Sequence, residues 1–257
     1  MTDSMATQPS LGRGDFSVGG VLKRSFSTFF ANFVPFLVLA LILYLPSLLL
    51  GFGSMGDLDA GTVAPQYTPA DFAVMALSVV LSYILIGALV YGTVQHLTGR
   101  SASLGDIIGR GLSRVVPVIV IAILLSIAVT VGFVLLVVPG IFLVVVYSVV
   151  IPAAVVERPG IIGSFKRSWE LTKGYRWPVL GLLLILFVIL VVFSFIVGAA
   201  AGFAIFFLDS LELLVVVNYV ISAISGAFAS VMIAVLYHDL RVAKEGVSSA
   251  QIAAVFD

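Results

Sequence analysis

Six apolar runs follow one another along the chain, separated by shorter polar connections. They fall at roughly 33–53, 71–96, 115–137, 141–155, 177–203 and 214–237. A bilayer core about 30 Å thick is crossed by roughly 20 apolar residues of helix, and most of the runs have about that length. The alternation typical of strands is absent, so we expect helices and not a barrel to satisfy the backbone hydrogen bonds. The pattern predicts an all-α fold with about six transmembrane helices.

Turn and cap residues mark some of the boundaries between these runs. Pro139 and Gly140 leave no room for a loop between the third and fourth runs, and so predict a tight helical hairpin. Before the second run, Thr68 can cap a helix whose first residue is Pro69, and Asp71 can return a hydrogen bond to the cap.

Composition agrees with a lipid environment, because 61% of the 257 residues are hydrophobic and only 10% are charged. The chain has no cysteine, which excludes disulfides and thiolate chemistry. We expect residues 1–14 to be a disordered cytoplasmic tail, residues 15–246 to form the six-helix membrane domain, and residues 247–257 to be a short cytoplasmic tail.

The basic residues predict the orientation of the chain in the membrane. All 13 Lys and Arg residues lie in the tails or in the connections after the second and fourth runs. The connection over residues 54–71 instead carries Asp57, Asp59 and Asp71. By the positive-inside rule, both termini are predicted to be cytoplasmic.

Three of the basic segments have the periodicity of amphipathic helices that precede a span. In the first, Lys23 and Arg24 lie away from an apolar face made by Leu22, Phe26, Phe29 and Phe33. In the last, the corresponding basic residues are Lys166, Arg167 and Lys173, and the apolar face is made by Ile161, Ile162, Phe165 and Trp169. A weaker middle copy has Arg110 and Arg114 off a face made by Leu104, Ile108, Leu112 and Val115.

The outer two segments align with each other. Residues 20–26 (GVLKRSF) match residues 163–169 (GSFKRSW) without a gap, and the same register places Pro35 on Pro178. We therefore predict a unit of one amphipathic helix and two spans, repeated three times in the same orientation.

Basic amphipathic helices beside a cytoplasmic leaflet attract anionic headgroups by about 1 kcal/mol per Lys or Arg, while aromatic side chains insert below the phosphates. The alternative is that the charges only direct topology and the aromatic rings only pack on the bundle. The candidate headgroup-contacting residues are Lys23, Arg24, Phe26, Arg110, Arg114, Lys166, Arg167, Trp169 and Lys173.

The ionisable residues do not form a pattern typical of catalysis. No charged residue lies in the middle of a run, and the two histidines, His96 and His238, lie at run ends without a paired spacing. A metal site is therefore not expected, and no Gly-Xaa-Ser-Xaa-Gly elbow is present. We expect no enzyme activity and no cofactor.

Several stretches resemble a bacterial family. They are Val138-Pro139-Gly140-Ile141, Ile151-Pro152 through Val156-Glu157, residues 164–174 (SFKRSWELTKG), and Tyr237-His238-Asp239-Leu240-Arg241 through Glu245-Gly246. Together they are similar to the membrane domain of the glycerophosphoryl diester phosphodiesterase membrane-domain family and its YciC-like relatives. The resemblance implies a six-helix bacterial inner-membrane protein in which Pro139, Gly140, Glu157, Asp239 and Arg241 belong to family motifs. The catalytic barrel of that family is expected to be absent here, and the phosphodiesterase activity with it.

The function expected from these observations is binding. We expect a non-enzymatic membrane protein that binds membrane lipids, a membrane-protein partner or copies of itself, and not nucleic acid. Because the candidate residues are lysines and arginines, the lipids are expected to be anionic. A transporter-like protein for a lipid or small amphiphile and an accessory subunit of a larger membrane complex are the alternatives.

Overall fold

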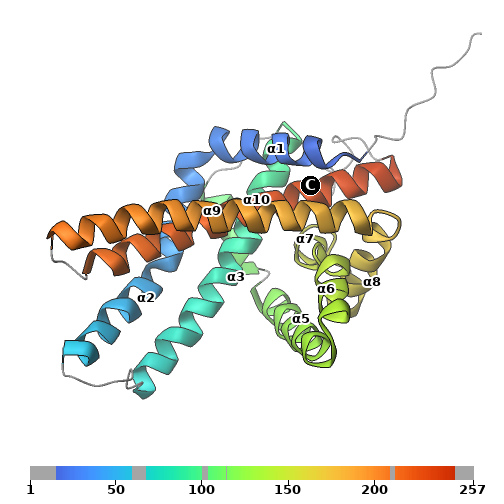
Figure 1. Ribbon diagram of the computed structural model, residues 1–257. Coiled ribbons are helices and arrows are strands. Elements are labelled where there is room, and N and C mark those ends of the chain that lie inside the picture. Colours follow the sequence, from blue (N-terminus) through green and yellow to red (C-terminus); the bar gives the residue numbers. More distant parts are fainter. Residues whose placement is uncertain (1–15, 60–67, 100–103, 114, 209–211, 247–257) are drawn as a thin grey trace, which may run out of the picture.

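The computed structural model describes residues 16–59, 68–99, 104–113, 115–208 and 212–246 (Figure 1). Within these ranges the chain forms helices and no strand. The helices are α1 (Val18–Ala31), α2 (Phe33–Asp59), α3 (Pro69–Leu97), α4 (Leu104–Ser113), α5 (Val115–Leu135), α6 (Val137–Val146), α7 (Val150–Val156), α8 (Gly160–Thr172), α9 (Arg176–Leu208) and α10 (Glu212–Glu245).

The helices supply six segments that are long and apolar enough to cross a membrane, which confirms the predicted fold class. The segments are Phe33–Gly53, Pro69–Leu97, Val115–Leu135, Val137–Val156, Arg176–Ala204 and Glu212–Glu245. The fourth is longer than predicted and is made of two helices, α6 and α7. Pro152 lies in the first turn of α7 and has no N–H to bond back to Ser148, so the helix is interrupted just before it.

Prolines mark the starts of the first span in each predicted repeat. Pro35, Pro117 and Pro178 each occupy the third position of a helix, in α2, α5 and α9 respectively. A proline costs nothing there, because the first N–H groups of a helix have no intrahelical partner. The cap predicted for α3 is also present, since the Thr68 hydroxyl accepts from the Asp71 N–H and the Asp71 carboxylate accepts from the Thr68 N–H at 2.7 Å.

The predicted hairpin between the third and fourth spans is present, but its turn lies earlier than predicted. The chain leaves helical geometry only at Leu136, and Pro139 and Gly140 lie in the first turn of α6. Gly132 and Gly140 let α5 and α6 approach closely, because a Cβ on Gly132 would lie 3.1 Å from the Gly140 Cα. The two glycines therefore set the spacing of the hairpin.

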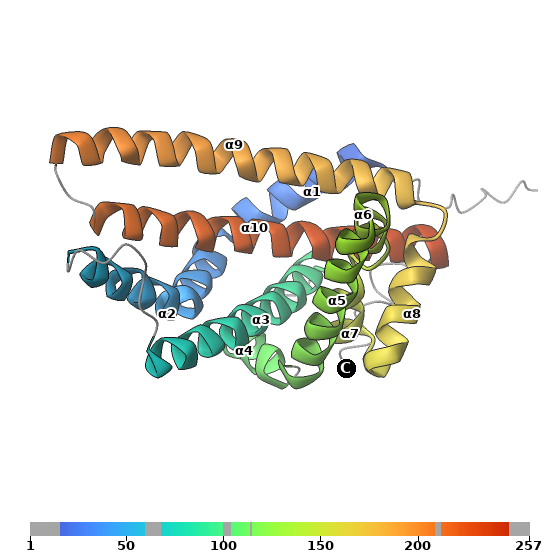
Figure 2. The same ribbon diagram turned by 60° about the horizontal axis from the view of Figure 1, so that its bottom comes forward.

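Helix α10 is the centre of the fold. It packs against α1, α2, α3, α7, α8 and α9. Figures 1 and 2 show α9 antiparallel beside it, with α2 and α3 crossing the pair obliquely, and the α5–α6 hairpin contacts α3 through α5 and α9 through α6. Close approach of α10 to α2 depends on Gly226, where a Cβ would lie 2.6 Å from the Tyr44 hydroxyl oxygen.

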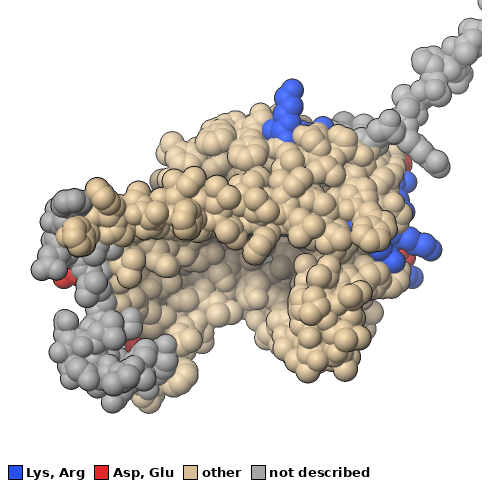
Figure 3. All heavy atoms as spheres, viewed as in Figure 1, with Lys and Arg blue, Asp and Glu red and all other residues tan. Residues whose placement is uncertain are grey.

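The surface of the bundle is largely apolar. Only 17% of the most apolar stretch of α9 is buried within the chain, against 50% for α10. On the face shown in Figure 3, which is hollowed between α3 and the α5–α6 hairpin, the Lys and Arg side chains lie at the upper edge and at the right-hand end. Such a surface requires lipid around it, so the chain is a multi-pass membrane protein.

We predict that Gly140→Ala destabilises the α5–α6 hairpin. The added methyl would meet the Phe133 ring at 2.5 Å, which forces either the ring or the helix to move and costs about 1–3 kcal/mol. Gly198→Ala in α9 is the control, because nothing lies within 4 Å of its added Cβ. The free energy of unfolding of each variant is measured by titration with a denaturing detergent. Equal values for the two variants would contradict the close hairpin.

Candidate membrane interface and its charged network

The last turns of α10 bury polar side chains at one end of the bundle. Tyr237, His238 and Asp239 are all buried, and Asp239 is only 8% exposed. A carboxylate withdrawn from water in this way is costly unless a cation and hydrogen bonds compensate it. The structure supplies the cation from α1 and a further polar contact from the adjacent His238.

The partner of Asp239 is Arg24 of α1. Its Nε donates to Asp239 Oδ2 at 3.1 Å, and its Nη2 donates to the same oxygen. The other carboxylate oxygen lies 3.2 Å from Nδ1 of His238. The ion pair ties the amphipathic helix α1 to the end of α10.

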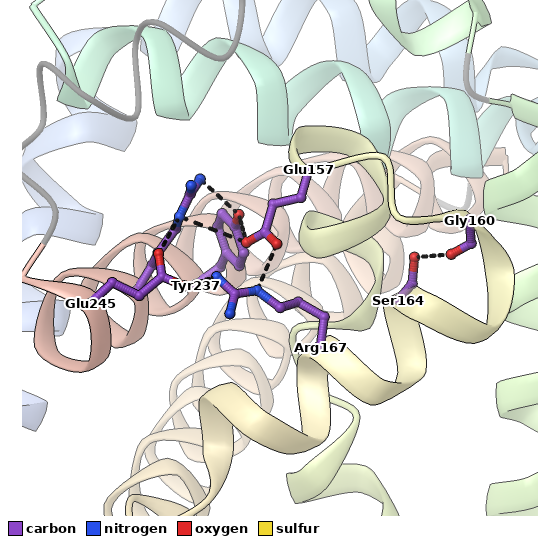
Figure 4. Close-up of polar contacts among 7 residues, drawn as sticks. Glu157, Gly160, Ser164, Arg167, Tyr237 and Glu245 are labelled. Atoms are coloured by element: carbon purple, nitrogen blue, oxygen red, sulfur yellow. Dashed lines mark hydrogen bonds and ion pairs between the residues drawn. The ribbon is translucent and has the colours of Figure 1, made fainter.

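A second cluster joins the α7–α8 connection, α8 and α10. We call Glu157, Arg167, Tyr237, Arg241 and Glu245 the α10 network (Figure 4). Nε of Arg167 lies 2.6 Å from Glu157 Oε2, and a second nitrogen of the same guanidinium binds Glu245. The Tyr237 hydroxyl donates to Glu157 Oε1 at 2.7 Å, and Arg241 Nε donates to Glu245 Oε2 at 3.0 Å.

The turn between α7 and α8 positions Glu157 for this role. Arg158 and Gly160 both have positive φ, at 57° and 79°, so the chain reverses directly after Glu157. Helix α8 then begins, with the Ser164 hydroxyl donating to the Gly160 carbonyl at 2.7 Å (Figure 4). As a result Glu157 faces Arg167 and Arg241 and not its sequence neighbour Arg158.

The charge of Arg167 is stabilised where it lies. Burial disfavours its cation, but hydrogen bonds and attraction to Glu245 and Glu157 together outweigh burial and raise the pKa of Arg167 above its ordinary value. The guanidinium is therefore a permanent charge, and it balances the carboxylates around it.

Helices α1 and α8 use corresponding positions in the same way. Val21 and Ser25 of α1 are fully buried, as are the aligned Ser164 and Ser168 of α8. These small side chains lie at the centre of the face that packs on the bundle, and in α1 the buried Phe29 packs beside them. The two aligned segments therefore bury the same two positions in the structure.

The structure separates the two basic residues of each aligned Lys-Arg pair. Arg24 and Arg167, both candidates for headgroup contact, are instead bound to carboxylates of the same chain. Their neighbours Lys23 and Lys166 are exposed and form no ion pair with any residue that the structure describes. Lys173, at the end of α8, is exposed in the same way.

The two aromatic candidates lie between the bundle and the surface. Phe26 is 38% exposed, and its ring lies 4.8 Å from that of Phe228 in α10. The aligned Trp169 is 40% exposed and lies 5.9 Å from Phe142 in α6. Each ring both packs on the protein and offers an apolar surface beside an exposed lysine.

The other candidate residues divide as follows. The side chain of Arg110 and the whole of Arg114 lie outside the described residues. Pro139 and Gly140 act in the hairpin, and Glu157, Asp239 and Arg241 in the ion pairs described above. Among the described residues, no three His, Asp or Glu side chains come together as metal ligands would.

The pattern of residues along the chain does not mark Tyr237, Glu245 and Arg176 as members of a site. Tyr237 and Glu245 flank Arg241 at a spacing of four residues, so they share one face of α10 with it. This periodicity is the signal that was available. Arg176 has no such signal in the sequence, and the structure places its side chain against two aromatic rings.

We predict opposite outcomes for neighbouring residues of α8. Arg167→Gln leaves Glu157 and Glu245 with one cation between them and should lower the free energy of unfolding by about 1–3 kcal/mol. Lys166→Gln, which removes the same charge from an exposed side chain, should change it by less than about 0.5 kcal/mol. The measurement is denaturing-detergent titration of both variants. Similar losses in both would mean that α8 is not held by the α10 network.

Comparison with known proteins gives one family. The chain matches the family model described as a domain of unknown function (DUF7847) over residues 66–240, from just before the cap of α3 to the buried end of α10. No curated protein matches the chain significantly. The same holds for solved structures. Because the match covers more than half of the 257 residues, the chain belongs to the family of the domain of unknown function DUF7847.

Proposed function

We propose that this protein binds anionic membrane lipids, through the lysines that its amphipathic helices leave free, and so organises lipid or a membrane partner at the cytoplasmic face of a bacterial inner membrane. The proposed function is non-enzymatic. The observation that carries it is repeated in α1 and α8: the arginine pairs with a carboxylate of the same chain, whereas the adjacent exposed lysine pairs with no described residue.

The chemistry of the two side chains supports this division. A guanidinium is planar and weakly hydrated, and suits partly buried pairing with carboxylates. An ammonium on a flexible stem keeps its water more strongly and reaches the headgroup layer from a helix at the membrane surface. If the basic residues served only to direct topology, α1 and α8 would not need to keep an exposed lysine beside an exposed aromatic ring.

The aromatic rings support a place at the membrane surface. Phe26 and Trp169 each leave more than a third of the side chain exposed next to Lys23 and Lys166. Trp177, at the start of α9, is 82% exposed. Tryptophan prefers the boundary between headgroups and acyl chains, where its ring is in an apolar layer and its N–H reaches water.

The resemblance to the glycerophosphoryl diester phosphodiesterase membrane-domain family supports a bacterial inner membrane. The distribution of charge supports the orientation, since exposed Lys166, Lys173 and Lys244 lie at the end of the bundle where α10 finishes. At the opposite end of α10, the first turn carries the acidic Glu212. We therefore place both termini in the cytoplasm.

The lipid proposal predicts a loss of headgroup preference in Lys23→Gln/Lys166→Gln/Lys173→Gln. The protein is reconstituted in vesicles of mixed anionic and zwitterionic phospholipid, and brominated lipids of each kind quench its two tryptophans, Trp169 and Trp177. The preference for anionic lipid should fall by about fivefold per lysine at low salt, which corresponds to about 1 kcal/mol per charge, and less as salt screens the charges.

The matched control is the same triple change to Arg, which keeps the charge and should keep the preference. Because none of the three lysines pairs with a described carboxylate, both triple variants should fold and insert. An unchanged preference in the Gln variant would show that these lysines act only as topology signals.

The orientation makes a separate prediction. A reporter fused after Asp257 should be active in the cytoplasm, and one inserted near Gly61 should be active in the periplasm. The first outer connection carries Asp residues and no Lys or Arg, whereas all 13 Lys and Arg residues lie on the side predicted to be cytoplasmic. A periplasmic C-terminus would contradict the proposed arrangement of six spans.

A further inference from the structure

Arg176 holds its charge without a carboxylate. Its guanidinium carbon lies 4.4 Å from the centre of the Trp169 ring and 4.9 Å from that of Phe142. Nε is buried, and no described residue accepts a hydrogen bond from it. Arg24, Arg167 and Arg241 each pair with an acidic side chain, whereas Arg176 forms no ion pair within the described part of the chain.

The two rings explain how the cation is held but not what its N–H groups bind. Aromatic faces attract a guanidinium and hold its plane in place. They accept little from its five N–H donors, and a donor left without a partner is costly in a partly buried place. The rings therefore anchor the cation, and the terminal N–H groups of its guanidinium, unlike the buried Nε, remain open to an anion from outside the described chain.

The start of α9 adds further donors at the same point. Arg176 is the first residue of this 33-residue helix. The backbone N–H groups of Arg176 and Trp177 donate to no described residue, and Pro178 has no N–H. The positive end of the helix dipole and these free N–H groups favour an anion with several oxygens.

The surroundings indicate which anion. Trp177 is 82% exposed directly beside Arg176, and Trp169 is 40% exposed. Tryptophans at the start of a span lie at the level of lipid headgroups. Lys173, three residues earlier, is exposed and adds a second positive charge. An anion with several oxygens at this depth is a lipid phosphate.

We infer that Arg176, together with the first N–H groups of α9 and Lys173, forms a binding site for the phosphate of one membrane phospholipid, whose acyl chains lie along the apolar surface of α9. The inference rests on the proposed function in one respect, namely that the ligand is a membrane lipid. The Arg176 site differs from the exposed lysines in what it recognises. A phosphate is present in both anionic and zwitterionic phospholipids, whereas the exposed lysines respond to the net charge of the headgroup.

The test counts phospholipid that stays bound to the detergent-purified protein, by native mass spectrometry. After exchange into phosphatidylglycerol or phosphatidylcholine, wild-type protein should retain one lipid with either. Arg176→Gln should lower the retained fraction by about tenfold, the change expected for loss of a charge-assisted hydrogen bond. Arg176→Lys keeps the charge but not the planar fork, and should retain an intermediate fraction.

Two controls separate this site from general charge effects. Arg158→Gln removes the same charge from an exposed position in the same connection and should retain the lipid. Lys23→Gln/Lys166→Gln should also retain it, whatever that variant does to headgroup preference. If Arg176→Gln retains lipid as wild type does, or if only phosphatidylglycerol is retained, the site is refuted while the proposed function can still stand.

Excess inorganic phosphate distinguishes the source of the anion. A lipid site should keep its phospholipid in the presence of inorganic phosphate, because the acyl chains contribute to binding. Displacement of the lipid by inorganic phosphate would mean that the ligand is a soluble phosphate, and would overturn the assignment to lipid.

Discussion

Glu157 and Asp239 are largely buried carboxylates at the end of a bundle that otherwise faces lipid, and each requires a cation nearby, while the more exposed Glu245 joins the same ion pairs. Arg24 meets that need for Asp239, and Arg167 and Arg241 meet it for Glu157 and Glu245. The cations come from α1, α8 and α10 itself, so neutralising the carboxylates also brings these helices together. A partly buried charge is stable only with its partner, and the pairs therefore determine which helices surround the end of α10.

The division between arginine and lysine follows from the same constraint. In both amphipathic helices the arginine lies next to the small buried residues and reaches a carboxylate, while the preceding lysine lies outside. The large aromatic side chains are shared between bundle and surface. The result is a protein whose Asp239 and Glu157 carboxylates are paired with arginines and whose Lys23 and Lys166 remain exposed.

Helix α10 connects these features to the membrane-spanning part. With 34 residues it is about 50 Å long, which exceeds the thickness of the hydrocarbon core. Its first part packs against α2 through Gly226, and its last turns carry the ion pairs. The family match ends at residue 240 and begins at residue 66, so it includes Glu157, Arg167 and Asp239 but not Arg24. Helix α1 thus adds a cation from outside the matched region.

The sequence by itself determined the features that depend on local physics. The length of the apolar runs predicted the six spans, and Thr68, Pro69 and Asp71 predicted the start of α3. A span depends only on the residues of one run, and a helix cap depends only on the residues of one turn. The turn at Leu136 was misplaced by a few residues, since proline is tolerated within the first turn of a helix. Only the tertiary structure decided which charges are free. Arg24 and Asp239 are 215 residues apart, and no periodicity links them. Lys23 and Arg24 are equivalent basic residues in the sequence. In the structure Arg24 leaves α1 toward Asp239 and pairs with it, whereas Lys23 is exposed and pairs with no described residue.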